Sequence, residues 1–343
     1  MSVTVKELDA GDAARWDAFV QACDEATFFH RAGWKTVIEN SFGQRGHLLY
    51  AERDGQIEGI LPIFDVKSRL FGHRLVSTAF CVGGAPAVTS DEALAALDRA
   101  AEDLMARTGA EYIEYRDPSR PHADWPKKEG LYANFERPTE ADEDANLKQI
   151  PRKQRAVVRK ALKADLVDEI DTDIDRFYGL YSPSMRNLGT PVFGKAYIRN
   201  LLDVFGDDCD ILTVSQNGRP LSSVLNFYFK DTVLPYYTGA DPEARKSGAA
   251  DLQYFRLMRR AVERGYTNFD FGRSKVDTGP YAFKKNWGFE PRPTVLEFKM
   301  KGGAALPDIN PNNPKYRFFI DTWKKLPLPV ANMIGPWLGK QVG

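Results

Sequence analysis

The chain has 343 residues, of which 43% are hydrophobic and 12% aromatic, and its Lys+Arg and Asp+Glu counts are both 47. This length and composition fit two folded domains of ordinary size and exclude a disordered chain. The formal net charge of zero argues against a dedicated nucleic-acid-binding function, because phosphate neutralisation supplies most of the affinity of such proteins.

The cysteines and the apolar runs narrow the class further. Cys23, Cys81 and Cys209 are far apart, so we expect neither a disulfide framework nor a metal site. No apolar run is long enough to span a bilayer, and the first residues lack the apolar stretch of a secretory signal. These features predict a cytoplasmic protein.

One β-hairpin pattern occurs twice. Residues 47–66 predict two strands joined by Asp54-Gly55, and residues 210–229 repeat the pattern around Asn217-Gly218. Each hairpin is followed by a strand or apolar stretch, a helix that ends at a glycine, and another strand. The predicted elements are a helix over 91–107 and a strand over 112–115, then a strand over 233–237, a helix over 249–264 and a strand over 268–271. The shared order and spacing indicate an internal duplication of one α/β unit.

A change of charge separates the two copies. Residues 151–163 hold six basic residues and no acid, whereas residues 164–175 hold six acids and no base. Pro151 predicts the first turn of a helix, and Arg152, Arg155, Arg159 and Lys163 then recur on one face of it. This face is a candidate phosphate clamp, and the alternative is a solvated helix surface.

A short motif precedes the second long helix. It has the form R-x-x-G-x-A and consists of Arg245, Lys246, Ser247, Gly248, Ala249 and Ala250. Small residues at a helix start let a diphosphate approach the free N–H groups and the positive end of the helix dipole. We therefore expect the donor to bind here, and the alternative is a flexible loop.

The order strand, R-x-x-G-x-A, helix, strand resembles the acyl-CoA-binding core of the GNAT N-acyltransferases. That family places a helix with a Tyr-x-x-x-Gly-Phe-Glu-like motif after the next strand, and here Tyr281-Ala-Phe-Lys-Lys-Asn-Trp-Gly-Phe-Glu290 has that place. The glycine-rich run 80–86 of the first copy does not precede its helix in the same way. The resemblance thus implies a donor site in the second copy only.

Nearly the whole chain resembles the FemAB family, in particular its Gram-negative, exosortase/PEP-CTERM-associated branch. The stretches that carry this resemblance are 150–155, 188–193, 270–275 and 278–288. It implies an α/β fold of two tandem GNAT-like domains, each a mixed, mostly antiparallel sheet flanked by helices. FemAB members attach amino acids from aminoacyl-tRNA to peptidoglycan precursors, and one activity implied for the Gram-negative branch is the bacterial ceramide synthase reaction.

This resemblance gives three expected segments. Residues 1–148 form the domain on the acceptor side, residues 149–306 form the domain with the donor site, and residues 307–343 form a tail. In 314–343, aromatic and apolar residues alternate with five basic residues and only one acid. Such a composition is typical of the interface of an anionic bilayer, and the alternative is packing on the second domain.

Lys284 is the principal catalytic candidate. GNAT enzymes often carry a tyrosine four residues before Gly-Phe, whereas the FemAB resemblance implies a lysine, and a cation here could stabilise the oxyanion or the departing thiolate. Asp270 is the candidate base for the acceptor ammonium, with an ion pair to Arg273 or Lys275 as the alternative. Tyr281 and Tyr237 are further catalytic candidates.

The remaining candidates are substrate contacts, and each has a structural alternative. They are Arg273, Lys275, Tyr236, Arg152 and Arg155. The basic residues could bind phosphate or simply pair with acids, and Tyr236 could contact the acceptor or pack in the core.

The sequence therefore predicts an N-acyltransferase that uses acyl-CoA as a co-substrate and has no permanently bound cofactor. We expect a lipid amine such as a sphingoid base as acceptor, with the protein cytoplasmic or peripheral on the inner membrane. A first alternative is an aminoacyl-tRNA-dependent ligase acting on a cell-envelope precursor, and only this alternative makes tRNA a partner. A second is a non-catalytic envelope- or exopolysaccharide-binding protein.

Overall fold

The computed structural model describes residues 2–303, 306 and 314–342. The chain forms two compact units. The first unit comprises Met1–Leu131, Thr294–Ile309 and Trp337–Gly343, and the second comprises Tyr132–Pro293 and Asn310–Pro336. The tail was expected to begin at residue 307, which lies outside the described residues.

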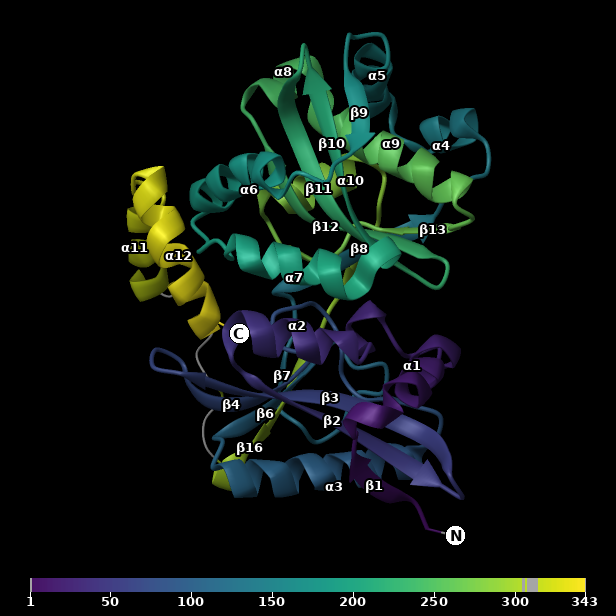
Figure 1. The fold of residues 1–343 in the computed structure, drawn as a ribbon, viewed down its shortest axis with the longest axis vertical. Helices are drawn as coiled ribbons and strands as arrows, with labels where there is room; N and C mark the ends of the chain where they lie inside the picture. The colour runs from purple at the N-terminus through teal and green to yellow at the C-terminus, as the bar shows by residue number, and fades with distance from the viewer. Residues whose placement is uncertain (1, 304–305, 307–313, 343) are drawn as a thin grey trace. The chain divides into compact units, whose positions relative to one another are not determined.

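The first unit is built on one mixed sheet. Its strands are, in spatial order, β1 (Thr4–Glu7), β2 (Arg45–Arg53), β3 (Gln56–Ser68), β4 (Gly72–Ser77), β6 (Tyr112–Arg116), β16 (Leu296–Met300) and β7 (Lys127–Lys128), with β5 (Ala87–Val88) beside β3. Among its described strands, β4 and β6 form the one parallel pair. Figure 1 shows α1 (Ala13–Ala22) and α2 (Gly33–Phe42) on one face and α3 (Asp91–Thr108) on the other.

The second unit repeats this arrangement. Its sheet follows the order β14 (Ser274–Lys275), β8 (Tyr132–Pro138), β13 (Asn268–Asp270), β12 (Thr232–Ala240), β11 (Arg219–Phe229), β10 (Cys209–Gln216) and β9 (Val167–Ile170), with β15 (Pro291–Pro293) beside β8. In the part of this unit that the structure describes, the one parallel pair is β12 with β13. The helices of this unit are α4 (Glu143–Gln149), α5 (Arg152–Ala161), α6 (Ile174–Leu188), α7 (Lys195–Phe205), α8 (Glu243–Ser247), α9 (Ala249–Glu263) and α10 (Gly279–Asn286).

Helices cover both faces of the second sheet. Successive side chains of a strand point to opposite faces, and on β11 the Phe227 ring lies 6.2 Å from Phe205 of α7. The next residue, Tyr228, belongs to the core cluster that holds Phe255 and Met258 of α9. The sheet thus lies between the α6–α7 layer and the α9 layer.

The predicted duplication is present in the topology, and the predicted fold class is confirmed. Both hairpin turns have two left-handed residues, with φ of 51° and 81° at Asp54 and Gly55 and of 50° and 76° at Asn217 and Gly218. These are the type I′ turns that match the twist of the strands. Both long helices are also followed by glycines of positive φ, Gly109 and Gly265.

The unit boundaries differ from the expected residues 148 and 306. In each sheet, one strand comes from a part of the chain that the expected boundaries assign to the other domain. In the first sheet, β16 pairs with both β6 and β7, although it follows the whole second unit in sequence. In the second sheet, β8 pairs with β13, β14 and β15, although it directly follows β7. The two units therefore exchange strands: β16, which follows the second unit in sequence, completes the first sheet, and β8, which follows the first unit, completes the second.

The C-terminal segment contains two helices, α11 (Pro314–Trp323) and α12 (Leu328–Val342). Short 3-10 turns lie at Ala10–Asp12, Phe28–His30, Gly206–Asp208 and Lys301–Gly303. Of the helices within the described residues, none has both the length and the apolar character needed to cross a membrane.

Candidate active site in the second unit

Two parallel strands separate early and leave one strand edge unpaired. The ladder between β12 and β13 covers only Thr232–Val233 against Asn268–Phe269, yet β12 continues to Ala240. On its other side β12 has a bulge at Tyr236, because Pro235 lies opposite Asn226 and Tyr237 lies opposite Leu225. Beyond Val233, β12 thus presents main-chain groups that the described part of β13 does not engage.

Asp270 is the last residue of β13. Its Oδ1 accepts hydrogen bonds from Asn134 Nδ2 at 3.0 Å and from the Gly272 backbone N–H at 2.8 Å. Burial raises the pKa of this carboxyl to about 6, and the two hydrogen bonds limit the rise. The alternative of an ion pair with Arg273 is not seen among the described contacts, and the Arg273 guanidinium instead lies 4.3 Å from the centre of the Tyr132 ring.

Lys284 lies in the last turn of α10, and its side chain turns inward, so that the residue is only 8% exposed. The Nζ atom donates hydrogen bonds to the carbonyl oxygens of Gly272 at 2.8 Å and Arg273 at 3.3 Å. It lies 5.5 Å from the ring centre of Phe135. Burial lowers the pKa of this amine to about 7, although the charge of Asp270 acts in the opposite direction. An amine with this pKa can gain or lose a proton near neutrality.

Contacts beyond the site hold α10 in place. Trp287, the C-terminal cap of α10, donates from Nε1 to Asp251 Oδ1 at 3.0 Å, and its carbonyl accepts from Arg137 Nη1 at 3.3 Å. Asp251 also accepts a hydrogen bond from Gln154 of α5. These bonds fix the helix that carries Lys284.

Of the predicted tyrosines, the structure places only Tyr281 beside Lys284. Its ring meets Phe135 edge-on at 5.2 Å, so both side chains contact the same ring. Tyr237 instead hydrogen-bonds Tyr197 of α7, with 3.0 Å between the hydroxyl oxygens, and burial raises the pKa of Tyr237 well above its usual range. Tyr236 packs against Tyr237 with 4.8 Å between ring centres. No described contact joins these two residues to Lys284 or Asp270.

The R-x-x-G-x-A motif is not an open loop, because its first residues belong to a short helix. Residues Glu243–Ser247 form α8, and Gly248 has φ of +81° before α9 begins. Arg245 and Lys246 are exposed, and the Ala249 N–H donates to Ser247 Oγ at 3.3 Å. A Cβ added to Gly248 would lie 2.9 Å from the Ala161 Cβ of α5. The motif and the basic helix α5 therefore lie in one region of the second unit.

The basic face of α5 has mixed roles. Pro151 caps the helix and is not its first residue. Arg155 donates to the carbonyls of Ile150 at 2.9 Å and Lys148 at 2.8 Å, so it caps the end of α4. Arg152 is exposed and remains a candidate phosphate contact. Lys275 lies on β14 opposite Tyr132.

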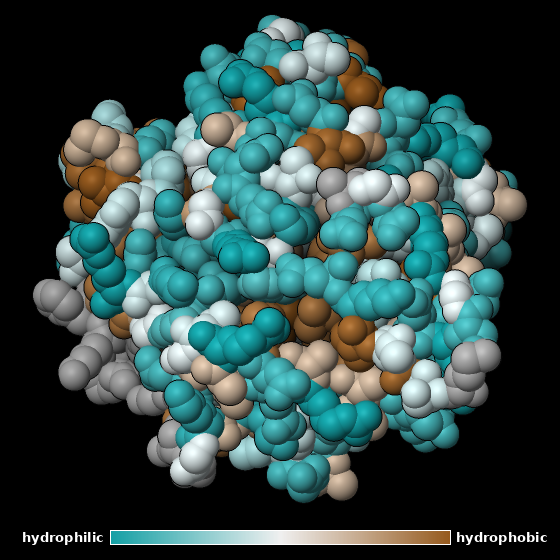
Figure 2. All heavy atoms as spheres, turned by 60° about the horizontal axis from the view of Figure 1, so that its bottom comes forward, coloured by the Kyte–Doolittle hydropathy of each residue, from teal (hydrophilic) through white to brown (hydrophobic). Residues whose placement is uncertain are grey.

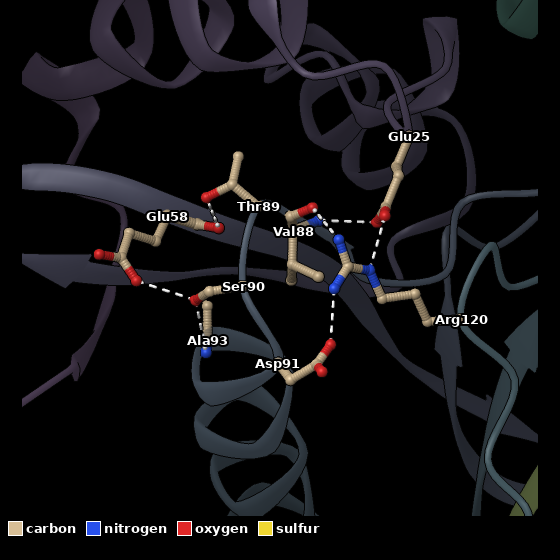
Figure 3. A network of polar contacts seen from close by, with 8 residues as sticks. All are labelled: Glu25, Glu58, Val88, Thr89, Ser90, Asp91, Ala93 and Arg120. Atoms are coloured by element: carbon tan, nitrogen blue, oxygen red, sulfur yellow. Dashed lines mark hydrogen bonds and ion pairs between the residues drawn. The ribbon is translucent and has the colours of Figure 1, made fainter.

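The corresponding place in the first unit is unsuited to a diphosphate. Figure 3 shows the N-terminus of α3, where Ser90 caps the helix and donates to Glu58 at 2.9 Å. Arg120 binds Glu25 at 2.7 Å and Asp91 at 2.6 Å in the same network. The three carboxylates of this network, Glu25, Glu58 and Asp91, outnumber the guanidiniums of Arg120 and of Arg53, which lies 2.9 Å from Glu58, and would repel phosphate.

Three residues around the site were not predicted, namely Asn134, Phe135 and Asp251. The first two lie on β8, which the expected boundary at residue 148 assigned to the wrong half of the chain. In β8 three consecutive residues, Ala133, Asn134 and Phe135, are buried before exposed Glu136, so the strand lacks a clear alternating pattern, and no local signal names its partner. Asp251 could have been suspected as an acid in the first turn of a helix.

Part of the chain matches a known protein family. Residues 146–285 match the family model described as an acetyltransferase (GNAT) domain, so the second half of the chain contains a GNAT-type acyltransferase domain. No curated protein matches the chain in sequence. Within the described residues, no group of three or more His, Cys, Asp or Glu side chains is arranged to hold a metal ion.

Solved structures share the fold. FemX superposes with a TM-score of 0.68 at 17% identity, covering 84% of this chain and 96% of FemX. The C-terminal domain of a protein assigned as a lysylphosphatidylglycerol synthetase of Agrobacterium fabrum gives 0.58 at 13% identity, over 85% and 93% of the two chains. A tandem GNAT protein of clavulanic acid biosynthesis gives 0.54 at 12%, over 89% and 100%. The chain thus has the fold of the tandem GNAT and FemX proteins.

Proposed function

We propose that this protein is an N-acyltransferase that moves an acyl group from a thioester to an amine. The observation that carries the proposal is that two buried groups lie beside the end of β13, where it separates from β12: Lys284, an amine with a pKa of about 7 that hydrogen-bonds the Gly272 carbonyl, and Asp270, a carboxyl with a pKa of about 6. Both values lie near the working pH, where proton transfer is most effective.

In the proposed reaction, Asp270 takes a proton from the acceptor ammonium, directly or through one water. The free amine nitrogen then attacks the thioester carbonyl, and the carbon–nitrogen bond forms as the carbon–sulfur bond breaks. Lys284 gives its proton to the departing thiolate, and the nitrogen loses its second proton to solvent. Tyr281 beside the same Phe135 ring is a second candidate proton donor.

For the donor, we propose acyl-CoA. Its phosphates would lie in the region of α5 and α8, where Arg152, Arg245 and Lys246 are exposed. The N-terminus of α9 follows the Gly248 turn and adds the positive end of its dipole. Arg273 and Lys275, which follow β13 in sequence, are proposed contacts for a phosphate or carboxylate of either substrate.

For the acceptor, we propose a lipid amine such as a sphingoid base, as in a ceramide synthase. The half-buried rings of Tyr236 and Tyr237 on β12 are the proposed contacts for its apolar chain. A protein of this fold is named for lysylphosphatidylglycerol, an aminoacylated lipid. The rival reaction is FemX-like aminoacyl transfer from tRNA, which the net charge of zero disfavours.

The test is thiol release by the purified protein from acyl-CoA donors of several chain lengths in the presence of lipid and soluble amines. We expect release that depends on both a long-chain amine and the acyl-CoA. Absence of release with every donor, combined with RNase-sensitive transfer from aminoacyl-tRNA, would establish the rival reaction. Binding of an envelope polysaccharide without any transfer would support the non-catalytic alternative.

A further inference from the structure

Helix α12 packs through its small residues. Ala331 is 1% exposed, and a Cβ added to Gly335 would lie 2.9 Å from Val192 Cγ1 and 3.1 Å from the Val192 nitrogen. Asn332 Nδ2 donates to Ser182 Oγ of α6 at 3.2 Å. The contact at Gly335 leaves no space for a larger side chain, so this packing fixes which face of α12 points outward.

The outward face of α12 carries its large apolar residues. Val330, Met333 and Trp337 follow one another at steps of three and four residues along this continuous helix, and they are 37%, 73% and 53% exposed. Steps of three and four place them on one side of a helix. A surface helix of a globular protein has the opposite arrangement, with its large apolar residues toward the core.

Neighbouring elements extend this apolar surface. Phe319 of α11 is 39% exposed and Leu188 at the end of α6 is 55% exposed. Gly189, the next residue, lies against α11, since an added Cβ would be 2.5 Å from Ile320 Cγ2. We call Leu188, Phe319, Val330, Met333 and Trp337 the apolar ridge. Figure 2 shows a group of tan and brown atoms at its upper left, on the side where Figure 1 draws α11 and α12.

Most charged residues of the C-terminal segment are positive, although Asp321 of α11 is exposed as well. Residues 314–343 contain five basic residues and one acid in a chain whose net charge is zero. Lys324 and Lys325 are exposed between α11 and α12. Lysine is depleted in protein–protein interfaces, whereas apolar and aromatic side chains flanked by lysine suit the headgroup region of an anionic bilayer.

We propose that the apolar ridge docks on an anionic membrane surface. Met333 and Trp337 enter the boundary between headgroups and acyl chains, and Lys324 and Lys325 remain among the lipid phosphates. The 15 residues of α12 are too few to span a bilayer, so the helix lies in the plane of the interface. This inference goes beyond the proposed function and does not depend on it.

The tryptophans of the chain allow a direct test. Trp337 is 53% exposed, whereas Trp16, Trp34, Trp125, Trp287 and Trp323 are at most 6% exposed. Quenching of the intact protein by brominated lipids therefore reports on Trp337. With vesicles of phosphatidylglycerol mixed with phosphatidylcholine, we expect quenching, a blue shift of emission and co-flotation, all weaker at high salt because the charges are screened.

Matched variants test separately how the apolar residues and the lysines contribute to vesicle binding. Met333→Glu should weaken binding by about tenfold or more, because a charge replaces the most exposed apolar side chain. The double variant Lys324→Glu/Lys325→Glu should remove the preference for phosphatidylglycerol over phosphatidylcholine alone. The control is Val167→Glu on β9, which is 61% exposed and outside the apolar ridge, and which should bind vesicles as the parent does.

Three outcomes would overturn the proposal. The first is the absence of both quenching and flotation for the parent protein with anionic vesicles. The second is equal binding by Met333→Glu and Val167→Glu, with thermal melts confirming that both variants fold. The third is a concentration-dependent dimer that Met333→Glu abolishes, which would make a second copy the occupant. The assay contains no acyl donor, so its failure is distinct from failure of the proposed acyl transfer.

Discussion

Lys284 differs from an ordinary surface lysine in what surrounds its amine. Two backbone carbonyls accept its hydrogen bonds, and the rings of Phe135 and Phe271 lie 5.5 and 5.8 Å away. Burial disfavours its charged form, which is how a lysine acquires a pKa suited to proton transfer near pH 7. The next residue, Lys285, is exposed and serves as its natural control.

Replacing Lys284 should impair turnover more than folding. Lys284→Met keeps the length of the side chain and removes the proton, so we expect kcat to fall by about 100-fold, as measured by thiol release. The midpoint of thermal unfolding should change little, because a buried amine with few partners stabilises the fold only weakly. Lys285→Met should leave both quantities near the parent values. Equal losses of activity in the two variants would contradict the assigned role of Lys284.

The pKa values of Asp270 and Lys284 predict a narrow pH optimum. With Asp270 required as carboxylate and Lys284 as ammonium, kcat/KM should rise through about pH 6 and fall above about pH 7. Because the two groups interact, the two pKa values seen in the profile describe the pair and not either residue alone. Asn134→Ala removes a hydrogen bond that favours the carboxylate, so the acidic limb should move to higher pH. A pH–rate profile unchanged in Asp270→Asn would refute the assignment.

Among the elements, β16 is tied to the first unit by a buried charged cluster. Glu297 of β16 is fully buried and accepts from His122 Nδ1 at 2.9 Å, while His122 Nε2 lies 2.9 Å from Asp98 Oδ2 of α3. Lys127 of β7 lies 3.3 Å from Glu297. The returning strand is therefore held by ion pairs as well as by its backbone ladder.

This cluster predicts a specific loss of stability at alkaline pH. Burial lowers the pKa of His122, but its hydrogen bonds to Asp98 and Glu297 outweigh burial and raise the pKa to about 9. Its contribution is then complete below about pH 6.5 and is lost as the pH rises through 9. The full shift corresponds to about 3.4 kcal/mol, and solvent screening of this partly exposed ring reduces it. Between pH 6 and 9.5, denaturant titrations should therefore show a fall in unfolding free energy about 2 kcal/mol larger than in His122→Gln. An identical pH dependence in the variant would exclude the cluster as its source.

Short sequence motifs predicted most helices, strands and turns. They could not predict which distant strands pair with one another. The Asp54-Gly55 and Asn217-Gly218 turns, the Ser90 cap and the helix-ending glycines each fix a conformation through a few neighbouring residues. The pairing of β8 with β13 and of β16 with β6 depends on contacts more than 100 residues apart. Asp270 and Lys284 were predicted because each lies next to a motif, whereas Asn134 reaches Asp270 only through the exchanged strand.

At the scale of the whole molecule, the exchange makes domain boundaries drawn from sequence unsafe. A fragment of residues 149–306 would lack β8, including Phe135 of the second core, and would retain β16 without its partners. We expect it to be insoluble or to unfold without cooperativity. A fragment of residues 132–293 keeps every strand of the second sheet and should be more stable by several kcal/mol.

Circular dichroism melts of the two fragments, expressed under the same conditions, make this comparison. Cooperative unfolding of the 149–306 fragment at the temperature of the 132–293 fragment would show that β8 contributes little to the second unit. The same pair of fragments would show whether acyl transfer needs the first unit, provided that the 132–293 fragment folds.

The position of β16 in sequence also determines when the first sheet can be completed during translation. Translation proceeds from the N-terminus, and residues 296–300 leave the ribosome only after the entire second sheet has been made. Until then β6 has no neighbour on one side, and such an unpaired edge is where nascent chains associate wrongly. The first half of this protein is therefore completed last, and chaperones that shield a waiting strand edge should influence its yield more than that of a protein whose domains close in order.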